Sequence, residues 1–205
     1  MAGAARALQA ISRRTVQRRE TRERVFEAAL AEIARSGLAA ADVGAIAAAA
    51  GVARGTFYFH FPTKEHVLAE LERREELRIV AGLERRAVSE GDLPALLTAV
   101  VRQVRAAERR LGPSLFRDML SIHFGATSPD GSRLDEHPVA VFIIEAARDA
   151  LRAGRIASDR DPNDVAVIFL TGLFALLATR GGPSRVRDAL LDTYVGTILQ
   201  GVVKS

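Results

Sequence analysis

Apolar residues recur at intervals of three and four positions along most of this 205-residue chain. That spacing places them on one face of an α-helix, whereas the period-two runs that indicate strands are absent at useful length. The clearest helical stripe consists of Leu93, Leu96, Leu97, Val100, Val101 and Val104. The pattern predicts an all-α fold, with three more helices at about 139–153, 162–179 and 184–203.

Two short helices are predicted on either side of Gly51, which can adopt the left-handed turn between them. Asp42 can cap the first of these helices by accepting hydrogen bonds from its free N–H groups. A long helix is expected over 63–86, and its middle segment, ELERREELR, is too polar to be buried all round. We therefore expect this long helix to bridge two bodies, and we expect a loop over 126–138.

Positive charge gathers at the start of the chain, although the formal net charge is only +4. Before position 25, two glutamates, Glu20 and Glu23, face seven arginines: Arg6, Arg13, Arg14, Arg18, Arg19, Arg22 and Arg24. An arm with this excess of positive charge commonly binds nucleic acid or another polyanion, and the competing interpretation is a solvated tail. We expect residues 1–19 to form a flexible basic arm.

Three further observations favour a cytoplasmic protein with no membrane partner. The chain has no cysteine, which excludes a disulfide scaffold and cysteine-based zinc or redox chemistry and is typical of a reducing compartment. The first twenty residues contain no apolar core of a signal peptide. The longest apolar run, 165–179, is shorter than the ~18–20 residues that cross a bilayer, so a buried helix is predicted there.

The region around Gly51 has the composition of a helix-turn-helix. The first short helix offers a small apolar inner face, with Ile46, Ala47 and Ala50. The second is rich in aromatic residues and is flanked by basic ones, and in a helix-turn-helix this second helix enters the major groove of DNA. Gly55 has no side chain and allows the start of that helix to approach DNA closely.

The stretch IAAAAGVARGTFYFHFPTKEHVL resembles the N-terminal signature of the tetracycline-repressor (TetR) family of bacterial transcription regulators. The resemblance covers about residues 20–70, and the rest of the chain is similar only in being helical and of suitable length. It implies a helix-turn-helix domain over 20–66, joined by the long helix to a helical ligand-binding and dimerisation domain over 67–205. The implied function is repression: a homodimer binds a palindromic DNA operator and leaves it when a small apolar effector binds.

The resemblance also implies which residues face DNA. Arg54 would read guanine and Thr56 would contact thymine or phosphate, while Tyr58 and His60 would hydrogen-bond phosphates. Phe57 and Phe61 are expected in the core, and the side of Phe59 is open. The complete DNA-facing set is Arg54, Gly55, Thr56, Tyr58, Phe59, His60 and Lys64, with Arg18 and Arg19 from the basic arm and Arg22 just after it.

The chain departs from the family at both short helices. Ala41 and Asp42 stand where the first helix usually carries threonines, and Ala53 replaces a common serine before the second helix. The carboxylate of Asp42 also places negative charge near DNA. We hypothesise that the arginine arm compensates by contacting phosphate or the minor groove.

Two sets of residues are assigned to the C-terminal domain. Large, mostly apolar side chains are predicted to line the effector pocket: Phe116, Met119, Leu120, His123, Phe124, Phe142, Ile143 and Phe174. Stripes on the last two helices are predicted to form a dimeric four-helix bundle: Val165, Phe169, Leu173, Leu176, Val186, Leu190, Tyr194 and Ile198. For both sets, ordinary core packing is the competing interpretation.

Other classes of protein fit the sequence less well. The chain has no HExxH, no G-x-S-x-G elbow and no phosphate-binding glycine loop, so we do not expect an enzyme. Its four histidines are not at metal-ligand spacing, and we expect neither a metal nor a cofactor. The alternatives that stay open are an activator of the same family and a helical ligand-binding or structural dimer that does not bind DNA.

Overall fold

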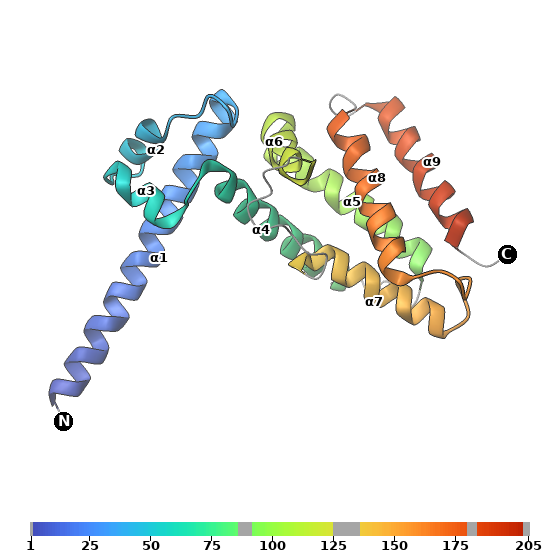
Figure 1. Cartoon of the computed structure of the whole chain (residues 1–205), viewed down its shortest axis with the longest axis horizontal. Helices are drawn as coiled ribbons and strands as arrows, with labels where there is room; N and C mark the ends of the chain where they lie inside the picture. Colours follow the sequence, from blue (N-terminus) through green and yellow to red (C-terminus); the bar gives the residue numbers. More distant parts are fainter. Residues whose placement is uncertain (1, 86–91, 125–135, 180–183, 203–205) are drawn as a thin grey trace. The chain divides into compact units, whose positions relative to one another are not determined.

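The computed structural model describes residues 2–85, 92–124, 136–179 and 184–202, which fold into α-helices joined by short connections (Figure 1). The helices are α1 (Ala2–Ser36), α2 (Val43–Ala49), α3 (Arg54–His60), α4 (Lys64–Glu84), α5 (Leu93–Leu111), α6 (Pro113–Phe124), α7 (Pro138–Arg152), α8 (Pro162–Thr179) and α9 (Arg185–Val202). The all-α prediction is confirmed, and α7, α8 and α9 begin and end within one residue of their predicted limits. Most of the loop predicted over 126–138 lies outside the described residues.

The chain divides into two compact units, an N-terminal unit of residues Met1–Leu68 and a C-terminal unit of residues Ala69–Ser205. The N-terminal unit contains α1, α2, α3 and the start of α4, and the C-terminal unit contains the rest of α4 and the remaining helices. One helix, α4, therefore runs from the first unit into the second.

Three phenylalanines form the centre of the N-terminal unit. The ring of Phe61 lies with its centroid 6.0 Å from that of Phe26 on α1 and 6.2 Å from that of Phe57 on α3. Phe57 and Phe61 are 0% and 1% exposed, as expected for core residues. Asp42 accepts hydrogen bonds from the N–H groups of Gly44 and Ala45, so it caps α2, and Gly51 takes the left-handed turn with φ of 65°.

The basic arm expected over residues 1–19 is not a separate segment, because residues 2–19 belong to α1. In Figure 1 the N-terminal half of α1 extends beyond α2 and α3 of the same unit. Alanine, leucine, arginine and glutamine are strong helix formers, and they dominate this stretch. The side chains of residues 13–20 are exposed, so their arginines are displayed along one helix.

In the C-terminal unit α8 packs against α6, α7 and α9. Among the described residues α8 is the one helix long and apolar enough to cross a membrane, a test that the core helix of a soluble protein also passes. Six residues of α8 are buried in the unit's core: Val165, Ala166, Phe169, Leu170, Leu173 and Leu177. The helix is therefore buried along one face only, which is less burial than the sequence predicts.

The residues predicted to form a dimer face fall into two groups, one buried in the single chain and one at least partly exposed. Val165, Phe169 and Leu173 are core residues of the single chain and have no surface left for a partner. The others are at least partly exposed: Leu176, Val186, Leu190, Tyr194 and Ile198. The large apolar side chains that α8 exposes most are Val167 and Ile168, at 43% and 58%.

Tyr194 joins α9 to α8 within one chain. Its hydroxyl donates to the backbone oxygens of Ile168 and Phe169, at 2.9 and 2.7 Å. A Cβ added at Gly172 would overlap this hydroxyl, so glycine is required for the two helices to approach so closely. Burial raises the pKa of Tyr194 to about 12.

The raised pKa of Tyr194 predicts a loss of stability at alkaline pH. The unfolded chain loses the phenol proton near pH 10, whereas the folded chain keeps it to about 12. The free energy of unfolding should therefore fall as pH rises through this window. The absorbance of tyrosinate, measured in the wild type and in Tyr194→Phe, isolates this group because the chain has two tyrosines and no tryptophan. Ionisation of Tyr194 near pH 10 with the helical circular dichroism intact would contradict the prediction.

A buried ion pair connects α5 and α9. The guanidinium of Arg187 donates to both carboxylate oxygens of Glu108, with one N–O distance of 2.7 Å. Both residues are 3% exposed. Two charges so far from water are stable only as a pair, so each residue depends on the other.

Candidate DNA-binding surface and ligand cavity

Helix α3 has one buried and one exposed face. Phe57 fixes the buried face in the core, while Tyr58 and Phe59 are 45% and 63% exposed. Arg54 and Gly55 are exposed in the first turn of the helix. The exposed face therefore carries a guanidinium, a phenol and an aromatic ring, groups that bind bases and phosphates.

Phe59, whose side the sequence left open, lies on the exposed face of α3. The guanidinium of Arg18 on α1 lies 4.9 Å from the centroid of the Phe59 ring. The attraction between a cation and the face of an aromatic ring holds the two side chains together. An arginine predicted to belong to a separate arm is thus placed beside the exposed face of α3, and the exposed Arg19 follows it on α1.

Positive charges from α1 also act on His60, at the end of α3. Arg22 covers the ring of Phe61, with its guanidinium 4.6 Å from the ring centroid. Burial, followed by the charges of Arg18 and Arg22, holds the pKa of His60 below its usual value. At neutral pH the imidazole is therefore uncharged, so it offers a phosphate an N–H donor but no positive charge.

Lys64 has a structural position that the sequence did not predict. Its Nζ donates to the backbone oxygens of Ala39 and Ala41, at 3.1 and 3.0 Å. These carbonyls belong to the connection between α1 and α2, so Lys64 fixes that connection to the start of α4. Two of its three N–H donors are used in this way, and only the third is left for a phosphate.

Replacing Lys64 with methionine should therefore lower the stability of the free protein, whereas a residue that only contacts DNA would leave it unchanged. The variant loses two charge-assisted hydrogen bonds, and we expect the free energy of unfolding to fall by about 2 kcal/mol. Chemical unfolding of the full chain measures this loss, with Arg24→Met as a control because Arg24 is exposed on α1. If Lys64→Met kept the wild-type stability but bound DNA more weakly, Lys64 would be a DNA contact and not a structural residue.

A cavity lies in the C-terminal unit between α4, α5, α6, α7 and α8. Its lining includes four of the eight predicted pocket residues, Phe116, Met119, Leu120 and Phe174. Ile143 is 0% exposed in the core and, like the half-buried Phe142, is not in the lining. The side chains of His123 and Phe124 lie outside the described ones.

One wall of the cavity is acidic, a feature that the sequence did not lead us to expect. Glu72, Glu75 and Glu76 of α4 all line the cavity and are 7%, 2% and 6% exposed. Glu75 is paired with Arg78 on its own helix, at 2.6 Å, and with Arg110 on α5. The ELERREELR segment is thus buried on one face because other helices supply partners for its charges.

The cavity is nearly closed in this conformation. Its water-accessible volume is about 20 Å³, room for about one water molecule. Eight of its eleven lining residues are apolar. A small organic molecule could enter only if side chains or helices moved apart.

Comparison with known proteins supports the assignment of the N-terminal unit. Residues 25–71 match the sequence profile of the bacterial regulatory proteins of the tetR family. The chain is 28% identical over 179 residues to the HTH-type transcriptional repressor KstR of Mycobacterium tuberculosis, a match that covers 84% of this chain and 78% of KstR.

Solved structures share the fold. SmeT, the repressor of the Stenotrophomonas maltophilia multidrug efflux pump SmeDEF, is 24% identical, with a TM-score of 0.58 over 91% of this chain and 93% of SmeT. The fatty acid degradation regulator FadR of Bacillus halodurans is 19% identical, with a TM-score of 0.59 over 87% of this chain and 98% of FadR. The solved structures show the shared fold, and the profile match over the helix-turn-helix together with the alignment with KstR shows that the chain belongs to the tetR family of bacterial regulatory proteins.

Proposed function

We propose that this chain is a cytoplasmic transcriptional repressor that binds operator DNA through α3 and releases it when a small, mainly apolar molecule occupies the cavity. The observation that carries the proposal is the two-sided α3. Phe57 anchors the helix in the core, whereas Arg54, Tyr58 and Phe59 face solvent. A helix held in this way presents its exposed side chains to the major groove at little entropic cost.

The arginines of α1 extend the proposed DNA surface. Arg18 lies over Phe59, and exposed arginines continue toward the N-terminus of α1. Guanidinium groups that neutralise phosphates release counterions from DNA, so they strengthen binding to any sequence. We assign the reading of bases to Arg54 and general attraction to the α1 arginines.

The repressor would act as a dimer on a palindromic operator. Val167 and Ile168 of α8 and Val186 of α9 expose apolar surface, and Val186 is 81% exposed. In a dimer, the second chain would cover these side chains, which the single chain leaves in solvent. Two copies would then place their α3 helices in successive major grooves, about 34–36 Å apart.

The effector would act on α4. This helix supplies four of the lining residues, namely Glu72, Glu75, Glu76 and Ile79, and it begins in the N-terminal unit. Because the cavity is nearly closed, a ligand binds only the conformation in which it is open, and this difference in affinity is what shifts the equilibrium. The relative SmeT has been solved in complex with triclosan, and the apolar lining favours a molecule of comparable character here.

The test is binding to the DNA beside the chain's own coding sequence, measured by fluorescence anisotropy at physiological salt. We expect at least one fragment to bind about a thousandfold more tightly than unrelated DNA of the same length. A reporter gene behind that fragment should be silenced when the protein is present. Equal affinity for all fragments would reject the function, and increased reporter output would make the protein an activator.

A further inference from the structure

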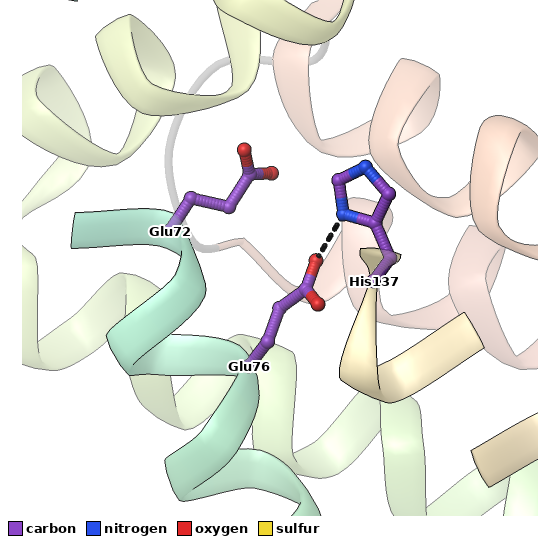
Figure 2. Close-up of side chains that lie close together, drawn as sticks. All are labelled: Glu72, Glu76 and His137. Atoms are coloured by element: carbon purple, nitrogen blue, oxygen red, sulfur yellow. Dashed lines mark hydrogen bonds and ion pairs between the residues drawn. The ribbon is translucent and has the colours of Figure 1, made fainter. Parts of the chain in front are cut away.

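Three potential metal ligands converge where α4 meets the start of α7. Glu72 and Glu76 are one turn apart on α4, and His137 immediately precedes α7. One ligand atom from each residue lies within 4.8 Å of the other two. Figure 2 shows the two carboxylates and the imidazole gathered in one place, with the hydrogen bond of 2.9 Å between Glu76 and His137 Nδ1 drawn as a dashed line.

The burial of Glu76 is not explained by the protein alone. The residue is 6% exposed, one carboxylate oxygen is bonded to His137, and the other has no hydrogen-bond partner among the described residues. A buried carboxylate oxygen without a partner is costly, because water has been removed and nothing replaces it. Both Glu72 and Glu76 line the cavity, so a cation there would lie between them.

Three arginines of α4 and α5 are bonded to other glutamates. Arg78 and Arg110 both bond to Glu75, and Arg74 bonds to Glu70 at 2.9 Å. At Glu76, one carboxylate oxygen is bonded to His137 and the other has no hydrogen-bond partner among the described residues. A divalent cation would bind this free oxygen of Glu76 and would leave the imidazole neutral as a nitrogen ligand.

We propose that Glu72, Glu76 and His137 bind a divalent transition-metal ion at the acidic wall of the cavity. Two oxygen ligands and one imidazole nitrogen suit Zn²⁺ and its neighbours, whereas Ca²⁺ and Mg²⁺ prefer oxygen ligands alone. Three protein ligands also leave a coordination position open to water or to another molecule in the cavity.

The ion would join two segments that are 61 residues apart in sequence, α4 and the start of α7. Since α4 begins in the N-terminal unit, metal binding would also alter operator affinity. This consequence rests on the proposed function, whereas the metal site does not. The site is therefore tested without DNA.

The experiment uses the full chain, freed of metal by a chelator and titrated with Zn²⁺ in a calorimeter, with Mg²⁺ as a comparison. We expect one Zn²⁺ per chain and no comparable binding of Mg²⁺. Glu76→Gln and His137→Gln should each weaken Zn²⁺ binding by at least about tenfold. Glu84→Gln should bind Zn²⁺ like the wild type, because Glu84 is exposed on the same helix.

Co²⁺ gives a spectroscopic readout that a purely structural ion pair would not produce. Visible absorption of bound Co²⁺ should be present in the wild type and in Glu84→Gln and absent in His137→Gln. Circular dichroism checks that the variants fold, and Glu72→Gln replaces any variant that does not.

Absence of stoichiometric Zn²⁺ binding, or equal binding in every folded variant, would overturn the proposal. So would tight binding of an organic cation such as rhodamine 6G that depends on Glu76 while Zn²⁺ does not bind. If the metal binds as expected but operator affinity stays the same, the site holds and only its regulatory consequence is lost.

Discussion

Replacing Arg187 with methionine is expected to lower the free energy of unfolding by about 3–5 kcal/mol. The substitution leaves the carboxylate of Glu108 buried, 3% exposed, without the guanidinium that bonds both of its oxygens. Methionine retains most of the side-chain volume, so the loss reports the unpaired charge more than a cavity. This loss of stability is measured by denaturant unfolding, with the fluorescence of Tyr194 as the signal. A Tyr58→Phe background leaves Tyr194 as the remaining tyrosine.

The double variant Arg187→Met, Glu108→Leu is the matched control. It removes both charges and should recover most of the lost stability, because an apolar pair can replace a buried ion pair at little cost. A cost below about 1 kcal/mol for Arg187→Met alone would mean that water reaches Glu108, contrary to its burial.

Replacing Phe57 with alanine is the second large effect that we expect. Phe57 is 0% exposed and its ring packs near those of Tyr58 and Phe61, so the substitution should cost about 3–5 kcal/mol. The reporter is the fluorescence of Tyr58, whose ring centroid lies 5.4 Å from that of Phe57, in a Tyr194→Phe background.

Phe59→Ala, two residues along the same helix, is the control for this prediction. Phe59 is 63% exposed, and its loss removes only surface contacts, with Arg18 and with the ring of His60, so stability should change by less than about 1 kcal/mol. Equal destabilisation by the two substitutions would mean that α3 does not have the two faces on which the DNA-binding proposal depends.

The helices were largely predictable from the sequence because their apolar residues follow the helical period without interruption. The placement of Phe57 and Phe61 in the core could also be predicted. Phe59 lies two residues from the buried Phe57 and therefore on the opposite face of α3. Its contact with Arg18 could not be predicted, because Arg18 lies 41 positions earlier and approaches α3 only in the folded unit.

The positions of the three glutamates in the acidic wall are set by their spacing along the helix that contains ELERREELR. The polarity of this segment gave no indication of them. Glu72, Glu75 and Glu76 fall on the same helical stripe as Leu68 and Ile79, a spacing that is visible in the sequence. What the sequence could not show is that Arg110 and His137 would meet them from other segments. Glutamate is seldom fully buried without a partner, so polarity alone indicated exposure.

The predicted dimer face was only partly correct, and the reason again lies in contacts between distant segments of the chain. An apolar stripe predicts burial without saying which surface covers it. In the structure Val165 and Phe169 face their own chain, and Tyr194 bonds to α8 of the same chain. The neighbouring Val167 and Ile168, which the stripe omitted, are the ones left exposed.

The central claim, that α3 reads a DNA sequence, is tested most directly by comparing Arg54→Ala with two other arginine variants on operator and unrelated DNA. We expect Arg54→Ala to lose about 1–3 kcal/mol of operator affinity and to bind unrelated DNA almost unchanged, because the proposal assigns Arg54 to a base contact. Arg18→Ala should weaken binding to both DNAs and reduce the salt dependence by about one unit of slope, because the proposal assigns Arg18 to a phosphate contact. Arg148→Ala, exposed on α7, should bind both DNAs like the wild type. If Arg54→Ala retained the full preference for the operator, α3 would not be the reading helix, and the proposed mode of DNA binding would be contradicted.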